Sequence, residues 1–258
     1  MVPQDHTSDH GLAVELATAA GELLRDIRRG LDAGGDPSEV RDAGDREAHR
    51  FIAGALAERR PDDPVLSEEA ADDLRRLRSQ RVWIVDPLDG TREFGEAGRD
   101  DWTVHVALCI DRKPLVGAVA QPVLGLCLST ADPHVLAAPS ARPPRMVVSR
   151  SRPPAWIPDV AADVGAEVIT MGSAGAKCMA VVRGLAEAYV HGGGQYQWDS
   201  AAPVAVALAA GLHASRIDGS ALIYNGRDLS VPDLVVCRSE LAPTLLAGLA
   251  RRALGPSD

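Results

Sequence analysis

The sequence predicts a mixed fold, with an α+β arrangement in the first half of the chain and an α/β arrangement in the second half. Three observations lead to this expectation. Two helical patterns open the chain, closely spaced strand patterns follow them, and strand and helix patterns then alternate to the end. The 258 residues suffice for one large or two modest domains, and a hydrophobic share of 46% is that of an ordinary globular protein.

The two opening helices are separated by a polar stretch. Apolar residues recur at helical spacing over residues 12–31, and the glycine pair that begins at Gly34 should end that helix. A second amphipathic pattern covers residues 48–56. The polar residues 36–44 between the two patterns are read as a loop, so Asp45 is expected at the beginning of the second helix.

The middle of the chain has the pattern of an antiparallel sheet. A short apolar run at residues 82–85 is typical of a buried strand, and a shorter strand is expected at residues 65–66. Further strands are expected over residues 103–110, 115–121 and 126–130. The turns between these three are short enough for an antiparallel meander.

The proline-rich residues 139–145 are the best candidate for a linker. They divide the chain into an expected α+β domain of residues 1–142 and an expected α/β domain of residues 143–258. Later strands are expected over residues 146–149, 168–171, 188–191, 222–224 and 234–237. Later helices are expected over residues 173–185 and about 200–210, with Pro203 in the first turn, and at the C-terminus.

Charge and composition exclude several classes of protein. The chain has 27 cationic and 36 anionic side chains, for a net charge of −9, and no basic run, so no nucleic-acid polymer is expected as a partner. No apolar stretch is long enough to span a membrane, and the polar N-terminus lacks the pattern of a signal peptide. The four cysteines are scattered and form no paired motif, as is usual for reduced thiols. We therefore expect a cytoplasmic protein.

The most informative motif follows the strand at residues 82–85. Asp86 and Asp89 leave the end of this strand on a tight turn, because Pro87 fixes its own backbone angle and keeps Asp86 out of helical geometry. Gly90 and Thr91 then open a short helix, whose free N–H groups favour a phosphate. Two carboxylates beside an anion site make chemical sense when a divalent cation lies between them.

Three further acidic positions stand where elements begin or end. Glu68 follows the expected strand 65–66, Asp45 stands near the second helix, and Asp199 follows a glycine-rich loop and Trp198. Taken singly, Glu68 is most simply explained as an acid that compensates a helix dipole, and Asp45 and Asp199 are most simply explained as helix caps.

Together, these motifs resemble a known family. Leu66-Ser67-Glu68-Glu69, the segment 83–91 (Trp-Ile-Val-Asp-Pro-Leu-Asp-Gly-Thr) and Trp198-Asp199 occur in the order and at the separations seen in lithium-sensitive, magnesium-dependent phosphatases. These comprise inositol monophosphatases, fructose-1,6-bisphosphatases and 3'(2'),5'-bisphosphate nucleotidases. The resemblance implies a layered αβαβα sandwich of the sugar-phosphatase type, with the active site between a metal-binding first half and a substrate-binding second half.

The resemblance also implies roles for individual residues. Two or three Mg²⁺ ions would be held by Glu68, Asp86, Asp89, Asp199 and the backbone carbonyl of Leu88. Asp45 and Thr91 would activate the attacking water, with Asp45 also near a third ion. The metal bound by Glu68 would serve the water, and the metal held by the three aspartates would serve the phosphate and the leaving group. The amides of Gly90 and Thr91 would hold a phosphoryl oxygen.

The chain departs from the family pattern in one stretch. The family usually has a Lys and a Thr ahead of the loop acid, in a K-x-D-x-x-T-x-x-D pattern. Here Pro37 and Asp42 stand in place of the Lys and the Thr, whereas Asp45 matches the final acid.

Three features bear on the substrate. Arg92-Glu93-Phe94 is similar to the Lys-Glu-Phe of bisphosphate nucleotidases, and the segment Gly172-Ser173-Ala174-Gly175-Ala176-Lys177 is similar to their Gly-Gly-Ala-Gly-Asn-Lys. The amides of that second segment and Lys177 are expected to meet a second phosphate or the ribose. His191 and three glycines stand where inositol monophosphatases place a Glu that binds sugar hydroxyls. The loss of this acid favours a ligand with a second negative charge.

We therefore expect a CysQ-type nucleotidase that removes the 3'-phosphate of 3'-phosphoadenosine 5'-phosphate to give AMP. This reaction would clear a by-product of sulfate assimilation. Hydrolysis of inositol 1-phosphate or fructose 1,6-bisphosphate on the same scaffold is the alternative. An aspartyl-phosphate phosphatase is disfavoured, because it would need its second Asp two positions after the first, and here it is three positions on. A nucleotide- or metal-sensing protein without catalytic activity is also disfavoured, because all the predicted metal ligands are present. A homodimer is expected by family likeness, and His105 is expected in the core or on a sheet face.

Overall fold

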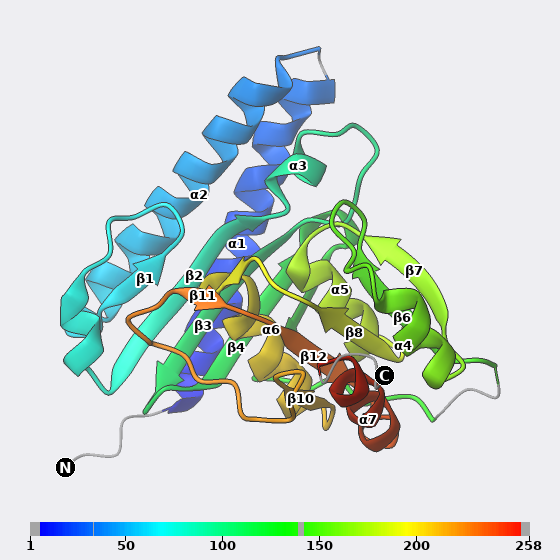
Figure 1. The fold of residues 1–258 in the computed structure, drawn as a ribbon. Coiled ribbons are helices and arrows are strands. Elements are labelled where there is room, and N and C mark those ends of the chain that lie inside the picture. The colour runs from blue at the N-terminus through cyan, green and yellow to red at the C-terminus, as the bar shows by residue number, and fades with distance from the viewer. Residues whose placement is uncertain (1–5, 33, 139–141, 254–258) are drawn as a thin grey trace.

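The structure is a computed structural model that describes residues 6–32, 34–138 and 142–253. Its elements are arranged in layers, with helices and sheets alternating across the molecule (Figure 1). The outermost layer on one side is formed by α1 (His6–Asp32) and α2, which pack against each other. None of the helices among the described residues combines the length and apolar character needed to cross a bilayer.

Helix α2 (Pro37–Arg59) begins earlier than the sequence pattern indicated, and the loop expected at residues 36–44 is wrong. The Asp36 side chain accepts hydrogen bonds of 2.8 and 3.2 Å from the second and third following backbone N–H groups, and proline occupies the first helical position. This is a favourable helix start, because the cap satisfies free donors and proline has none to lose. Asp45 therefore lies well inside α2 rather than at its beginning.

The first sheet has five strands in the order β1-β2-β3-β4-β5. β1 is parallel to β2, and the remaining neighbours are antiparallel, which confirms the expected meander. The strands are β1 (Val65–Ser67), β2 (Arg81–Asp89), β3 (Thr103–Ile110), β4 (Lys113–Gln121) and β5 (Leu126–Ser129). Short helical turns η1 (Leu74–Arg78), α3 (Thr91–Phe94) and η2 (Pro122–Leu124) lie between them.

The register of β2 against β3 shifts between Asp86 and Asp89. In a regular strand, residues three positions apart point to opposite faces. The irregularity breaks this alternation, and Pro87, which has no N–H to donate, lies within it. Both carboxylates can therefore turn toward the same side of the sheet.

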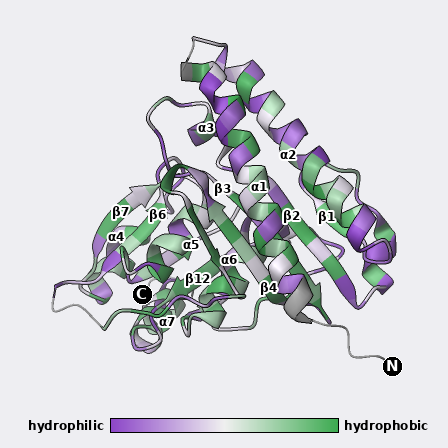
Figure 2. Ribbon diagram, turned by 180° about the vertical axis from the view of Figure 1, so that it is seen from behind, coloured by the Kyte–Doolittle hydropathy of each residue, from purple (hydrophilic) through white to green (hydrophobic). Residues whose placement is uncertain are grey.

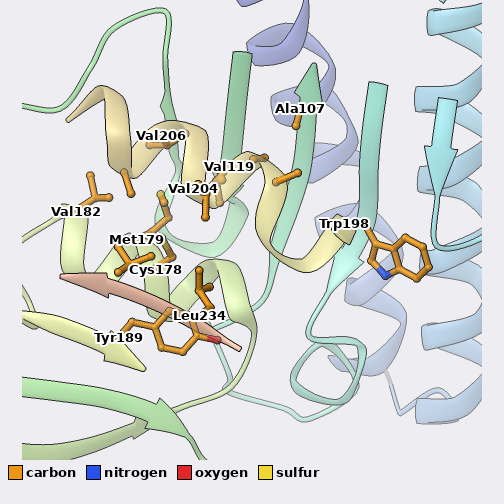
Figure 3. Packing of buried hydrophobic residues seen from close by; sticks show 14 of the residues in the cluster. Ala107, Val119, Cys178, Met179, Val182, Tyr189, Trp198, Val204, Val206 and Leu234 are labelled. Atoms are coloured by element: carbon orange, nitrogen blue, oxygen red, sulfur yellow. The ribbon is translucent and has the colours of Figure 1, made fainter. Parts of the chain in front are cut away.

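The middle layer consists of α5 (Ala174–Val182) and α6 (Gln197–Ala209), which pack against each other, with α6 lying on the first sheet. α6 begins three residues before the expected start, so Pro203 lies inside it rather than in its first turn. Figure 3 shows Met179 of α5 and Val204 of α6 packed together, with Tyr189 and Leu234 on the side of the second sheet.

The second sheet has the order β10-β12-β8-β6-β7. Its strands are β6 (Arg145–Ser149), β7 (Glu167–Met171), β8 (Ala188–His191), β10 (His213–Ser215) and β12 (Leu234–Cys237). β6 is parallel to β7 and to β8, whereas β12 and β10 are antiparallel to their neighbours. α4 (Ile157–Asp163), which the sequence analysis missed, and α7 (Ala242–Ala253) cover its outer face. A separate ribbon joins β9 (Gln195–Tyr196) to β11 (Ser230–Val231).

The strand expected at residues 222–224 is wrong. This segment instead crosses to the first half of the chain, where the N–H of Tyr224 donates to the carbonyl of Arg112 over 3.1 Å. The fully buried Arg76 guanidinium binds the next two residues, Asn225 and Gly226, with two hydrogen bonds of 2.9 Å. Of the expected linker 139–145, residues 139–141 lie outside the described part, and β6 begins at its last residue.

Apolar side chains form three cores among the described residues, and these match the boundaries between layers. One core lies between α1, α2 and the first sheet, a second surrounds α5 and α6, and the third lies between the second sheet and the outer helices. Figure 2 shows hydrophobic and hydrophilic residues alternating along α1 and α2, as expected for helices with one buried face. The arrangement is therefore the predicted αβαβα sandwich.

Candidate active site

Three carboxylates meet where the first sheet faces the middle layer. Asp86 and Asp89 come from the end of β2, and Asp199 comes from the first turn of α6. One oxygen from each lies within 4.8 Å of the other two. This spacing is small enough for a single cation to bridge all three, and the sequence analysis predicted this set of ligands.

Asp86 is the carboxylate whose surroundings fit a cation most clearly. The side chain is 1% exposed, and its Oδ1 accepts a hydrogen bond of 3.1 Å from the N–H of Leu88, while Oδ2 has no hydrogen-bond partner among the described residues. Burial raises the pKa of Asp86 well above its usual range, and the nearby carboxylates of Asp89, Glu68 and Asp199 raise it further. A divalent cation fits this site because it would supply the missing partner and offset the crowding of negative charge.

Asp89 is held in place by the second half of the chain. Its Oδ2 accepts hydrogen bonds of 2.5 Å from the Ser173 hydroxyl and 2.6 Å from the Gly175 N–H, and its Oδ1 accepts one of 3.2 Å from the Ala174 N–H. Burial alone would raise the pKa of Asp89, but the hydrogen bond and charge of His105, the charge of Lys177 and the hydrogen bond of Ser173 together lower it below its usual range. This carboxylate is therefore ionised and already oriented.

The segment that was expected to meet a second phosphate thus has internal partners. The amides of Ala174 and Gly175 donate to Asp89, and the Nζ of Lys177 donates to the carbonyl oxygens of Gly172 and Ser173. Lys177 is only 5% exposed, and its ammonium lies 5.4 Å from the centre of the Tyr189 ring. Contacts between this segment and a substrate stay a prediction.

His105 is buried as expected, and it also contacts the site. Its Nδ1 lies 3.0 Å from the carbonyl oxygen of Trp198, and its Nε2 lies 2.8 Å from the Thr103 hydroxyl and 3.3 Å from Oδ2 of Asp89. Because the Trp198 carbonyl must accept, Nδ1 donates to it. Thr103 and His105 are two positions apart and therefore share a face of β3, a signal that the sequence already carried.

The Asp199 carboxylate helps to begin α6. Its Oδ2 accepts a hydrogen bond of 2.6 Å from the N–H of Tyr196, the residue that precedes the helix. Burial raises the pKa of Asp199 to about 6, and Asp89 raises it as well. The sequence analysis expected Asp199 to be the helix cap; it instead lies in the third helical position and bonds back to the cap residue.

Glu68, Asp45 and Thr91 lie near this cluster but outside the group of three. Burial raises the pKa of Glu68 to about 7, with Asp199 and Asp89 contributing. Burial also raises the pKa of Asp45 to about 7, although a hydrogen bond with Thr91 lowers it in part. The Thr91 hydroxyl also lies 3.2 Å from the Leu88 carbonyl oxygen, so its single proton can be donated to either of the two acceptors.

Gly44 explains how Asp45 reaches this position. A Cβ atom on Gly44 would lie 2.8 Å from the ring of Phe94 in α3, so the absent side chain allows α2 to pack closely against the end of β2. Asp45, the next residue of α2, is thereby brought beside Thr91. The sequence alone could not give this close approach, because it depends on helices distant along the chain.

A cleft of about 260 Å³ lies between the two halves, and Asp89 and Asp199 of the carboxylate cluster line it, whereas Asp86, Glu68 and Asp45 do not. From the first half it is lined by the predicted residues Asp89, Gly90, Thr91 and Arg92. From the second half it is lined by the predicted residues Gly172, Ser173, Ala174, Lys177 and Asp199. Gly175 is not among the lining residues, because its N–H and Cα face Asp89 and His105 instead.

The sequence analysis missed several residues of the cleft, among them Arg152 and Gln195. Arg150, two positions before Arg152, is paired with the carboxylates of Glu93 and Glu96 at 2.6 and 2.9 Å. No carboxylate of the described residues forms an ion pair with Arg152. A guanidinium without a carboxylate partner at the edge of a cleft is suited to bind an anion.

The comparison with protein families agrees with this geometry. The family model described as the inositol monophosphatase family matches residues 6–137 and 144–253, which is most of the chain. The chain belongs to the inositol monophosphatase family. The family match therefore agrees with the cluster of Asp86, Asp89 and Asp199, which the motifs predicted and the structure brings together.

Within the family, the chain is similar to curated bacterial proteins. It is 48% identical over 257 residues to the 3'-phosphoadenosine 5'-phosphate phosphatase of Mycobacterium leprae, with 94% of each chain covered. It is 34% identical to the 3'(2'),5'-bisphosphate nucleotidase CysQ of Escherichia coli strain K12, with 83% of this chain and 93% of that protein covered.

Solved structures of the family have the same fold. The crystal structure of CysQ from Bacteroides thetaiotaomicron matches with a TM-score of 0.77 and 28% identity, covering 90% of this chain and 97% of the other. The inositol monophosphatase from Anabaena matches with a TM-score of 0.76 and 19% identity, covering 96% and 97%. The second likeness concerns the fold alone.

Proposed function

We propose that this protein is a phosphoric monoester hydrolase that removes the 3'-phosphate of 3'-phosphoadenosine 5'-phosphate, producing AMP and inorganic phosphate with the help of Mg²⁺. The proposal is carried by one observation: the relative from Mycobacterium leprae, named for this substrate, is 48% identical over nearly the whole of both chains. The cluster of Asp86, Asp89 and Asp199 supports the chemistry, since all three of its carboxylates are kept together here.

The residues fit a metal-dependent mechanism. Asp86, Asp89 and Asp199 would hold one Mg²⁺, and Glu68 and the Leu88 carbonyl would contribute to a second, with Asp45 near a third. When bound, such ions would stabilise the phosphoryl oxygens and lower the pKa of a bound water. The number of ions is part of the proposal.

The protein's own groups would do the remaining work. The carboxylate of Asp45 would take up the proton of the attacking water, and Thr91, hydrogen bonded to Asp45, would orient that water. The N–H groups of Gly90 and Thr91 would bind a phosphoryl oxygen. The domain roles follow from these contacts: residues 1–142 supply most metal ligands, and residues 143–258 supply the groups around the rest of the substrate.

Arg152 supports a substrate with two phosphates. The ester bond must lie beside the carboxylate cluster, whereas Arg152 approaches the cleft from the second half and has no carboxylate partner among the described residues. A second phosphate could meet this guanidinium, which an uncharged polyol could not do. Inositol 1-phosphate has a single phosphate and would leave Arg152 without a partner.

The test is a comparison of phosphate release. Initial rates with 3'-phosphoadenosine 5'-phosphate, inositol 1-phosphate and fructose 1,6-bisphosphate should be measured at one Mg²⁺ concentration, with and without Li⁺. The proposal requires the highest kcat/KM for the nucleotide and inhibition by Li⁺. A higher kcat/KM for either of the other esters would assign the protein to the alternative activity on this scaffold. Sedimentation analysis of the same sample would test the predicted homodimer.

A further inference from the structure

Two polar atoms in the wall of the cleft have no hydrogen-bond partner in the part of the chain that the structure describes. They are Nε2 of His191, at the end of β8, and Oε1 of Gln195, at the start of β9. Both side chains line the cleft, and both are more than nine-tenths buried, with exposures of 8% and 6%. A buried polar atom without a partner is costly, so its place in a binding cleft points to a ligand that completes it.

The second nitrogen of His191 determines what Nε2 can do. The His191 ring has a hydrogen bond with the backbone of Gly193 that raises its pKa, so the backbone atom accepts and the ring donates. Because Nε2 has no partner among the described residues, the donor is Nδ1. Burial lowers the pKa of His191 to about 4, and Lys177 lowers it further. In the neutral ring with the proton on Nδ1, Nε2 offers only a lone pair.

The amide of Gln195 is oriented by a buried tyrosine. Its Nε2 donates a hydrogen bond of 2.7 Å to the hydroxyl of Tyr189, whose ring packs in the core beside Leu234 (Figure 3). The other end of the amide, Oε1, is thereby left as an acceptor. His191 and Gln195 therefore present two acceptors in the wall of one cleft.

We propose that His191 and Gln195 form a recognition site that accepts hydrogen bonds from a donor group on the nucleoside part of the substrate. This inference rests on the proposed function and extends it to the specificity of the same cleft. Two groups of 3'-phosphoadenosine 5'-phosphate have the required chemistry, the 2'-hydroxyl and the exocyclic amine of adenine. Water can satisfy both acceptors in the free protein, but a bound ligand displaces it and must then supply the donor.

The site also explains a feature of the sequence. His191, Gly194 and Gln195 line the cleft at this point, and none of the three is an acidic residue. A carboxylate at this point would repel a substrate with two phosphates, whereas neutral acceptors would not. Neutral acceptors therefore allow the cleft to read a donor without opposing the charge of the ligand.

The inference is tested by changing one donor at a time on the substrate. We would measure kcat/KM of the wild-type protein for 3'-phosphoadenosine 5'-phosphate, for its 2'-deoxy analogue and for its inosine analogue, which has no exocyclic amine. One analogue should be hydrolysed less efficiently by about tenfold to a hundredfold, because its binding leaves buried acceptors unpaired. The analogue that suffers the loss identifies the donor.

Variants then assign the effect to the two residues. In Gln195→Leu and His191→Phe, the ratio of kcat/KM between the parent nucleotide and the affected analogue should fall toward one. Gln195→Glu, which keeps an acceptor at this position, should retain a preference for the parent. The matched control Gln80→Leu, at an exposed position before β2, should keep the wild-type ratio.

The outcomes separate the two proposals. Equal hydrolysis of all three nucleotides by the wild-type protein would overturn the recognition site and leave the proposed function intact. A wild-type ratio retained in both Gln195→Leu and His191→Phe would overturn it as well. No turnover of any of the three nucleotides, with turnover of inositol 1-phosphate, would overturn both. Because the wild-type comparison needs no variant, poor folding of either variant would not prevent a decision.

Discussion

The backbone N–H of Gly175 donates a hydrogen bond of 2.6 Å to Oδ2 of Asp89, and this contact joins the first turn of α5 to the end of β2. A predicted metal ligand from the first half of the chain is thus oriented by the backbone of the second half. The contact is possible because residue 175 has no side chain: a Cβ atom there would lie 2.1 Å from Nε2 of His105 and 2.4 Å from Oγ1 of Thr103.

Substitution of this glycine should therefore damage both stability and activity. For Gly175→Ala we expect a loss of about 1–3 kcal/mol in the free energy of unfolding, because the added methyl overlaps His105 and Thr103. Activity should fall by at least about tenfold, since Asp89 would shift with its donor. Thermal unfolding and phosphate release would measure both effects. Gly54→Ala, in α2 with nothing within 4 Å of its Cβ position, should be neutral or stabilising.

Asp89→Asn should abolish most turnover while the protein still folds. The amide of Asn removes a negative charge from the cluster and has only one oxygen that can accept hydrogen bonds. We therefore expect Mg²⁺ affinity and kcat/KM to fall by at least about a hundredfold. This loss would exceed the one that usually follows mutation of a residue that only hydrogen bonds to a metal ligand. Calorimetric Mg²⁺ titration and phosphate release would measure this. Asp63→Asn, in the half-buried ion pair with Arg81, should lower the melting temperature but leave Mg²⁺ affinity unchanged. Near-normal turnover by Asp89→Asn would contradict the assignment of this ligand.

The stability of the metal-free protein should depend on pH in an unusual direction. The raised pKa values, about 7 for Asp45 and Glu68 and about 6 for Asp199, mean that the folded state binds protons that the unfolded state releases near pH 4. This contribution to stability is complete below about pH 4 and is lost as the pH rises to about 7.

Mg²⁺ should reverse that dependence, because it binds the ionised carboxylates. The rise in melting temperature caused by Mg²⁺ should be larger at pH 8 than at pH 5.5, and Mg²⁺ binding should release protons into the buffer. At a hundred times the dissociation constant, the stabilisation should be about 2.7 kcal/mol. Melting curves in EDTA and in Mg²⁺ across this range would test the prediction, which an equal shift at all pH values would contradict.

Arg152→Gln should weaken the binding of a second phosphate. We expect KM for 3'-phosphoadenosine 5'-phosphate to rise by roughly tenfold or more, as for the loss of a charge-assisted hydrogen bond. The effect on 3'-AMP, which has no 5'-phosphate, should be smaller. Arg227→Gln, at an exposed position that does not line the active-site cleft, is the matched control. Equal effects on both nucleotides would place the 5'-phosphate elsewhere.

Asp36→Ala should destabilise the protein through the start of α2. Loss of the cap should cost about 1 kcal/mol, or a few degrees in melting temperature for a chain of this size. Ser38→Ala keeps the cap carboxylate and should have little effect. Denaturant unfolding would compare the two variants, and equal stabilities would show that the cap contributes nothing.

Much of this fold could be predicted because its elements have local causes. β3 and β8 occur where the apolar patterns placed them, and the motif around Asp86 and Asp89 is a local feature of one strand end. The early start of α2 could also have been predicted, since Asp36 followed by proline is a recognised beginning of a helix. The polar composition of residues 36–44 outweighed that signal in the sequence analysis.

The remaining features depend on contacts between distant parts of the chain. Residues 222–224 have the composition of a strand, but Tyr224 bonds to Arg112, and Asn225 after it bonds to Arg76, rather than to a neighbouring strand. His105 reads as a core residue until the fold brings Asp89 and Trp198 against it. The unpaired acceptor atoms of His191 and Gln195 can be recognised only in the folded structure, once the hydrogen bonds of the surrounding described residues are known.

The hydrogen bonds of Arg76 to Asn225 and Gly226 join the two halves of the chain, which has a consequence for separating this enzyme into two fragments. If the chain were cut near residue 142 and the two pieces were purified, neither would contain a working centre, since each lacks groups that the other provides. When mixed, the two fragments could bind each other through the hydrogen bonds of Arg76 and through the packing of α6 on the first sheet. The enzymatic activity recovered after mixing would then measure how much of the two fragments had reassembled.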